Sequence, residues 1–154
     1  MGLETINDPI LRKNWEKFIN LADDRFKKEN INLNFNTFKN DGSYSKAKAM
    51  LPGVYFAFAQ DSRRTWVELE LKARTSKGKR YSQDELYTFL KENFRNNGYK
   101  TNNKITWNEE DLANSPRNPN GLDKRIKIYL HKPTNEEWIQ AMIDLSNIFM
   151  QYLI

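Results

Sequence analysis

The sequence contains no cysteine and only one histidine among its 154 residues. The absence of cysteine excludes disulfides, thiolate zinc sites and a cysteine nucleophile. A single histidine, His131, is too few for a His-rich metal site and for most Ser–His relays. It ends an expected strand, and no acid–base partner accompanies it in a motif, so we interpret it as a surface or capping residue.

Long apolar runs and a strongly one-sided charge are also absent. No apolar run approaches the roughly 20 residues of a membrane span. The opening MGLETINDPI lacks the basic and apolar regions of a secretory signal, so we expect a cytoplasmic protein that does not bind membranes. Lys and Arg number 25 against 20 Asp and Glu, a formal net charge of +5. That balance permits an acidic partner without requiring one.

Aromatic residues are plentiful, with 9 Phe, 7 Tyr and 4 Trp. They are too many for a disordered chain and indicate a core built from large side chains. No repeat, low-complexity tract or linker divides the chain. The length therefore predicts a single domain over residues 1–154.

Amphipathic periodicity predicts helices over about residues 9–29 and 82–97 and from residue 134 onward. Asp8 precedes a proline and is suited to cap the first helix. Ser82 with Glu85, and Thr134 with Glu137, have the spacing of capping boxes. In such a box a hydroxyl and a carboxylate each satisfy a free backbone amide, so these pairs predict where the second and third helices begin.

Alternating or apolar segments predict strands over residues 31–38, 53–60, 64–74, 104–108 and 124–131. Residues 45–50 fit neither pattern clearly. Short connections between neighbouring strands favour antiparallel pairing. The order predicts an α+β fold, with a mostly antiparallel sheet of about five strands and three helices packed on one face. We expect the other face to be partly open to water.

Several short pieces, in the same order along most of the chain, resemble a known family. They are Asn14-Trp15-Glu16-Lys17-Phe18, Val67-Glu68-Leu69, Phe94 to Gly98, Ile105-Thr106-Trp107, Lys124-Arg125-Ile126 and Glu137-Trp138. On these the chain resembles the prokaryotic domain of unknown function 4268, although the loops over residues 72–80 and 109–123 look longer than expected. Members often follow restriction-nuclease-like domains in defence-associated proteins. The resemblance therefore implies a defence or nucleic-acid context, and it transfers no catalytic residue.

The stretch over residues 63–80 begins as an alternating strand and continues as a basic loop. Val67, Leu69 and Leu71 fall on one side of that strand, and Trp66, Glu68, Glu70 and Lys72 fall on the other. Basic side chains can neutralise phosphates, and a neighbouring aromatic ring can stack on a base. The same side chains could simply form the solvated side of the strands. The candidate nucleic-acid-binding residues are Arg63, Arg64, Lys72, Arg74, Lys77, Lys79, Arg80, Lys124, Arg125 and Lys127.

Glu70 and Lys72 also match the second half of the PD-(D/E)xK nuclease pattern. Two carboxylates on one strand face could hold Mg²⁺ while the lysine stabilises developing charge. The candidate residues of that site are Glu68, Glu70 and Lys72, with Asp61 as a third ligand. The favoured interpretation is structural, because Glu-x-Lys is common on strands that form cross-strand ion pairs, here with Arg125 or Lys127.

The leading functional hypothesis is a non-catalytic accessory domain of a bacterial or phage defence-related system that contacts nucleic acid through its basic loop. No catalytic residue, metal ligand or cofactor is assigned. One alternative is a protein-interaction module or inhibitor that uses the open sheet face around Trp66, Glu68, Glu70 and Tyr129. The other is the Mg²⁺-dependent nuclease. A homodimer formed through the half-open face is a further hypothesis.

Overall fold

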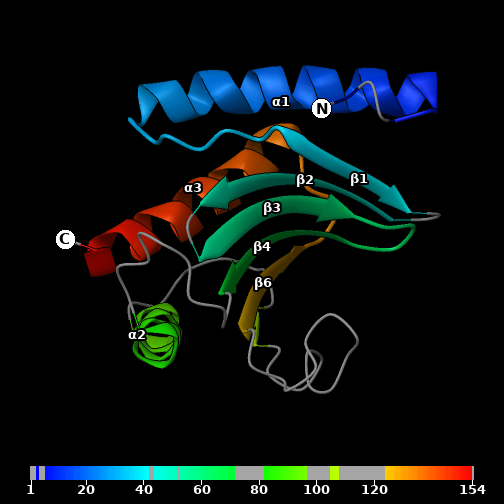
Figure 1. The fold of residues 1–154 in the computed structure, drawn as a ribbon. Helices are drawn as coiled ribbons and strands as arrows, with labels where there is room; N and C mark the ends of the chain where they lie inside the picture. Colours follow the sequence, from blue (N-terminus) through cyan, green and yellow to red (C-terminus); the bar gives the residue numbers. More distant parts are fainter. Residues whose placement is uncertain are drawn as a thin grey trace.

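A computed structural model of the chain describes residues 3, 6–41, 44–51, 53–71, 82–96, 105–107 and 124–153. Its elements are α1 (Pro9–Lys28), β1 (Thr37–Asp41), β2 (Tyr44–Leu51), β3 (Val54–Gln60), β4 (Thr65–Leu71), α2 (Gln83–Asn96), β5 (Ile105–Trp107), β6 (Lys124–Leu130) and α3 (Asn135–Leu153). The predicted α+β class is confirmed (Figure 1).

The strands form one sheet of six in the order β1-β2-β3-β4-β6-β5, and all five pairings are antiparallel. Strands β1 to β4 follow one another through short connections, and β6 lies between β4 and β5. The predicted hairpin of β3 and β4 is present. The strand that the sequence did not predict is β2, which contains residues 45–50, where the sequence pattern was ambiguous.

The predicted strand over residues 31–38 is wrong for most of its length. Residues 31–36 lie outside the sheet, and β1 begins only at Thr37. Leu33 and Phe35 are nevertheless buried, whereas Asn32 and Asn34 are exposed. Alternating polarity reports burial of one side of an extended chain, which does not require hydrogen bonds to a neighbouring strand.

The helix starts follow the predicted capping residues. Asp8 Oδ1 accepts hydrogen bonds from the backbone amides of Ile10 and Leu11, at 2.9 and 3.3 Å. In α3 the backbone amide of Glu137 donates to Thr134 Oγ1 and that of Thr134 donates to Glu137 Oε1, both at 3.1 Å. This reciprocal pair is the capping box that the sequence predicts.

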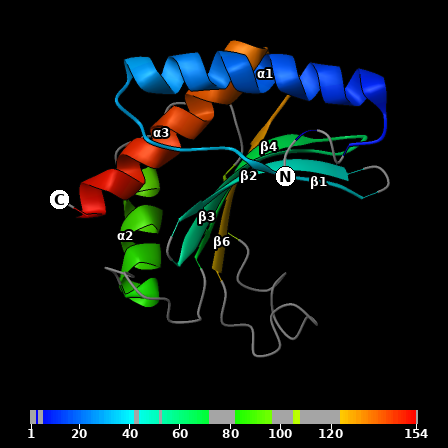
Figure 2. The ribbon, with the colours of Figure 1, turned by 45° about the horizontal axis from the view of Figure 1, so that its top comes forward.

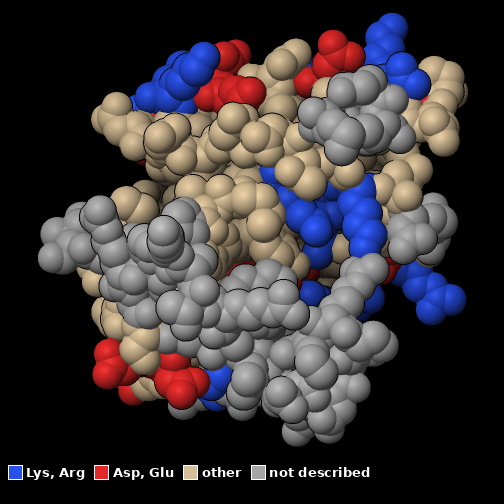
Figure 3. Space-filling view, in the orientation of Figure 1, with Lys and Arg blue, Asp and Glu red and all other residues tan. Residues whose placement is uncertain are grey.

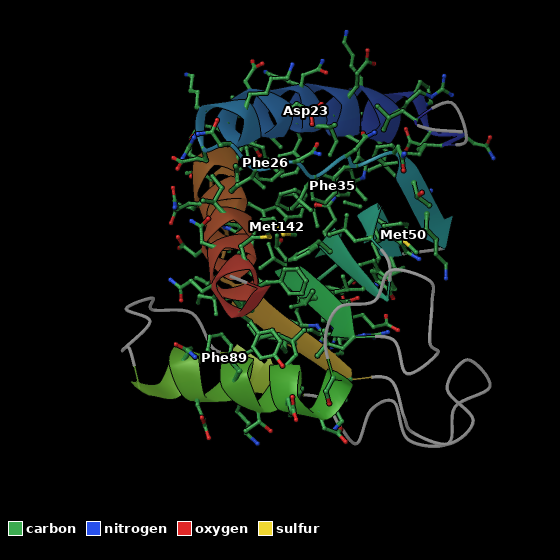
Figure 4. The ribbon with its side chains drawn as sticks, turned by 60° about the vertical axis from the view of Figure 1, so that its left-hand side comes forward. Asp23, Phe26, Phe35, Met50, Phe89 and Met142 are labelled. Carbon is green, nitrogen blue, oxygen red and sulfur yellow. The ribbon has the colours of Figure 1, made fainter. Side chains whose placement is uncertain are left out.

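All three helices bury their apolar sides in one core on the same side of the sheet. Helices α1 and α3 cross over this face, and α2 lies beside the carboxyl-terminal half of α3 (Figure 2). Phe26 and Phe35 pack between the helices and the sheet with ring centroids 5.6 Å apart (Figure 4). The rings of Phe89 of α2 and Tyr152 of α3 pack together with their centroids 5.1 Å apart. None of the described helices lies on the opposite face of the sheet.

Candidate functional site

The face of the sheet turned away from the helices carries mainly charged and aromatic side chains. Strand register places Lys48, Glu68 and Lys127 in one row across β2, β4 and β6, with Ala57 of β3 between the first two. Glu70 lies directly opposite Arg125. The predicted side of β4 and its predicted opposition to β6 are therefore confirmed.

Four of these side chains form a buried ion network, defined here as Lys46, Glu68, Glu70 and Arg125. Lys46 Nζ donates to Glu68 Oε2 at 2.8 Å, and Arg125 Nε lies 3.5 Å from the same oxygen. Arg125 Nη2 donates to Glu70 Oε2 at 3.1 Å. The other Glu68 oxygen accepts from Trp66 Nε1 at 3.1 Å. The predicted cross-strand ion pair with Arg125 is present.

We expected this face to be partly open to water, and its central residues are instead buried. Glu68 is 0% exposed, Glu70 3% and Trp66 3%. Lys46 and Arg125 reach the two carboxylates and the Trp66 indole donates to Glu68, because long basic and aromatic side chains bury their apolar parts while their polar ends find partners. Trp66, Glu68 and Glu70 are buried, so a protein partner could reach them only after neighbouring groups moved.

Opposing influences act on the ionisation of Glu68. Burial by itself raises the pKa of this carboxyl group, but the charges of Lys46 and Arg125 and the hydrogen bond from Lys46 together outweigh burial and hold the pKa below its ordinary value. Glu68 is therefore a carboxylate at neutral pH. Its oxygens already accept from a lysine and an indole, so a metal ion would have to displace those bonds.

Asp61 is the third acid of the nuclease alternative. Its carboxylate forms hydrogen bonds within the turn before β4. Its Oδ1 accepts hydrogen bonds from the backbone amides of Arg63 and Arg64 at 2.8 and 2.7 Å. In the part of the chain that the structure describes, no group of three or more His, Asp or Glu side chains is arranged to hold a metal ion. Lys72 lies outside the described residues.

A cluster of three lysines, which sequence reasoning missed, lies on β1 and β2. Lys39 is directly opposite Lys46, and Lys48 follows two residues along the same face. Burial, and then repulsion from Lys46 and Lys39, lower the pKa of Lys48, and the attraction of Glu70 and Glu68 offsets this only in part. Figure 3 shows Lys and Arg side chains gathered in front of β1 to β3. These lysines therefore lie close enough to repel one another.

A second basic group lies on the β4–β6 side. The Arg64 guanidinium lies over the rings of Trp66 and Tyr129, 5.5 and 5.0 Å from their centroids, and donates to the Tyr129 hydroxyl at 3.2 Å. Lys127 Nζ lies 5.3 Å from the Trp66 ring centroid. Arg64 also pairs with Asp61 at 3.3 Å. We call Lys39, Lys46, Lys48, Arg64, Arg125 and Lys127 together the cationic face.

The predicted binding residues separate into four groups. Arg64, Arg125 and Lys127 belong to the cationic face, and Arg63 is exposed in the turn before β4. Lys124 instead pairs with Asp84 at the start of α2, at 2.7 Å. The loop residues Lys72, Arg74, Lys77, Lys79 and Arg80 lie outside the described part of the chain. The signal for the missed lysines was the spacing Lys46-Ala47-Lys48, which places both basic side chains on one face of a strand.

No protein-family model, curated protein or solved structure matches this chain. Among the residues that the structure describes, none of the helices has the length and apolar character needed to span a membrane. Function is therefore argued from the cationic face itself.

Proposed function

We propose that the cationic face binds the phosphate backbone of nucleic acid without catalysis. The observation that supports this most is the excess of positive charge on one side of the sheet. Six basic side chains gather there, and the described carboxylates in contact with them are those of Glu68, Glu70 and Asp61. Phosphates are the anions that such a surface would neutralise, with release of the counterions bound to nucleic acid.

Lys39 and Lys48 are the basic residues of this face best placed for a ligand. Neither forms an ion pair with a carboxylate among the described residues. Both are part-exposed, whereas Lys46 is 4% exposed and held by Glu68. Burial, and then repulsion from Lys46 and Lys39, lower the pKa of Lys48, and the negative charge of a phosphate beside its amine would act in the opposite direction.

The biological setting rests on the sequence resemblance alone. That resemblance, to the domain of unknown function 4268, supports an accessory role in a prokaryotic or phage defence-related system. A non-catalytic role is supported by the pairing of Glu68 and Glu70 with Lys46 and Arg125, since a Mg²⁺ site needs carboxylate oxygens free to coordinate. The basic residues within 72–80 stay candidate phosphate contacts on the strength of the sequence.

The double variant Lys39→Gln/Lys48→Gln tests this proposal. We expect weaker binding of a labelled oligonucleotide in fluorescence anisotropy, and a plot of log affinity against log salt that is shallower by about 2 units, because each lost phosphate contact removes about 1 unit. Mg²⁺ is present throughout, and the probe is checked afterwards for cleavage. A melting curve confirms that the variant is folded.

The matched control is Lys13→Gln/Lys28→Gln, which removes the same charge from exposed positions on α1. A second arm reverses Lys77, Lys79 and Arg80 to glutamate and measures the share of binding due to the loop. Equal losses in the α1 control and the face variant would show that net charge, and not this face, controls binding. Absence of binding by the unmodified protein at low salt would reject the proposal, and cleavage of the probe would reject its non-catalytic part.

A further inference from the structure

Each of the four aromatic rings described on the cationic face has a basic group over it. The distances to ring centroids are 5.4 Å for Lys46–Tyr44, 5.1 Å for Lys48–Tyr55, 5.3 Å for Lys127–Trp66 and 5.0 Å for Arg64–Tyr129. Cations in such positions are attracted by the electron density of the ring face. The rings therefore hold the charged ends of the basic side chains in place across the sheet.

The same arrangement leaves little ring surface for stacking on nucleic-acid bases. Trp66 is 3% and Tyr55 6% exposed. Tyr44 stacks on Trp66 with centroids 6.0 Å apart, and Tyr129 packs against Trp66 at 5.7 Å. Proteins that bind single strands generally combine a basic groove with accessible aromatic rings on which bases stack. This face has the basic groups, but the Trp66 and Tyr55 rings are covered, and Tyr44 and Tyr129 are only part-exposed.

The basic groups also have a two-sided distribution. Lys48 on β2 and Lys127 on β6 lie in one row, three strand spacings apart. At about 4.8 Å per spacing their backbones are about 14 Å apart. The amine of Lys48 lies over Tyr55 of β3 and that of Lys127 over Trp66 of β4, and the buried carboxylate of Glu68 lies in the row between the two lysines. Basic groups on two sides of one face can contact two phosphate backbones, as a protein does across a groove of duplex DNA.

We propose that the cationic face binds double-stranded DNA across a groove, through phosphates on both strands and without reading bases. This inference rests on the proposed function and narrows it to one class of nucleic acid. Lys39 and Lys48 contact one strand, and Arg64 with Lys127 contacts the other. A single strand offers only one backbone and would engage one of the two groups at a time.

The test is a competition experiment with the full chain and a labelled duplex. Unlabelled duplex, either of its single strands, and a duplex of unrelated sequence are added at equal phosphate concentration. We expect the duplexes to compete at least about tenfold better than the single strands, and the two duplex sequences to compete equally. Single strands that compete as well as duplex would overturn this inference and leave the proposed function standing. Failure of every oligonucleotide to bind would remove both.

One variant in each of the two basic groups of the cationic face makes the test specific. Lys48→Gln and Lys127→Gln should each weaken duplex binding and reduce the salt slope by about 0.9, and the two losses should add in the double variant. Lys132→Gln, an exposed lysine beyond the end of β6, is the matched control and should leave duplex affinity unchanged. A loss confined to only one of the two face variants would contradict two-strand contact, because each side would then not be needed.

Discussion

Glu68 occupies a position where a carboxylate is costly unless it is paired. It is completely buried and accepts from Lys46 and Trp66 while Arg125 lies beside it. Removing one member of a buried ion pair leaves the other charge uncompensated, which costs far more than the pair contributes in net stability. The buried ion network holds two positive and two negative groups, so its charge balance depends on each member.

Glu68→Leu should lower the free energy of unfolding by about 3–5 kcal/mol, because Lys46 and Arg125 would then share only Glu70. The double variant Lys46→Met/Glu68→Leu restores the balance, so its loss should be smaller than the sum of the single losses by about 0.5–3 kcal/mol. Urea denaturation measures the two single variants, Glu68→Leu and Lys46→Met, and the double variant.

The control for this cycle is an exposed ion pair in the same molecule. Arg25 and Glu136 join α1 to the start of α3, and the Glu136 side chain is 55% exposed. Glu136→Ala should cost no more than about 1 kcal/mol, as is usual for exposed pairs. Strictly additive losses for Lys46 and Glu68 would show that the two residues do not stabilise one another.

At the scale of elements, the sequence predicted best the helix starts, which depend on interactions between residues close together in the chain. The capping residues at Asp8 and Thr134 act on amides two or three positions away, so their spacing alone predicts where α1 and α3 begin. Strand β2 was missed because Ala47 and Ala49 have low strand preference, and their value lies in fitting beneath the helices. Residues 31–36 were called a strand because burial on one side produces the same alternation as pairing in a sheet.

Thr134→Ala tests the local contribution of the α3 cap. The variant loses the hydroxyl that accepts from the Glu137 amide, so we expect a loss of about 1 kcal/mol in unfolding free energy. For a chain of this size that corresponds to a fall of about 2–4 °C in melting temperature. Circular dichroism follows the transition. Thr88→Ala, at an exposed position within α2, should be neutral or slightly stabilising, and an equal fall there would argue against a capping effect.

At the scale of the whole molecule, the cationic face combines residues from β1, β2, β4 and β6 and from the turn before β4. Opposition of β4 to β6 could be anticipated from two adjacent charged strands, which is why Arg125 was expected beside the glutamates. The contribution of Lys39 could not be anticipated from the sequence, because it depends on the pairing of β1 with β2. Burial of Glu68 also depends on side chains that are distant in sequence, so no local pattern predicts it.

The pH dependence of global stability follows from the charges of Lys46 and Arg125 beside Glu68, which outweigh the effect of its burial. The pKa of Glu68 is lowered in the folded protein, from an ordinary value of 4.5 that applies to the unfolded chain. Between these two values the unfolded chain binds the extra proton, so the stabilisation is fully present above about pH 4.5 and is lost as pH falls through the folded pKa. Asp23 affects the pH dependence of stability in the opposite direction, because its pKa is raised in the folded protein. Burial raises this pKa, the attraction of Lys27 lowers it, and repulsion from Asp24 raises it.

Comparing the chain with its Glu68→Gln variant isolates this contribution from other acidic groups. We expect the unmodified protein to be more stable at pH 7, and the difference in unfolding free energy to shrink steadily as pH falls below 4.5, since protonation then removes from Glu68 the charge that glutamine lacks. Urea denaturation at a series of pH values measures both chains. Glu92→Gln, at an exposed position on α2, should give a small difference at every pH. A Glu68→Gln difference that stayed constant from pH 7 to acid would show that the carboxylate charge contributes nothing to folding.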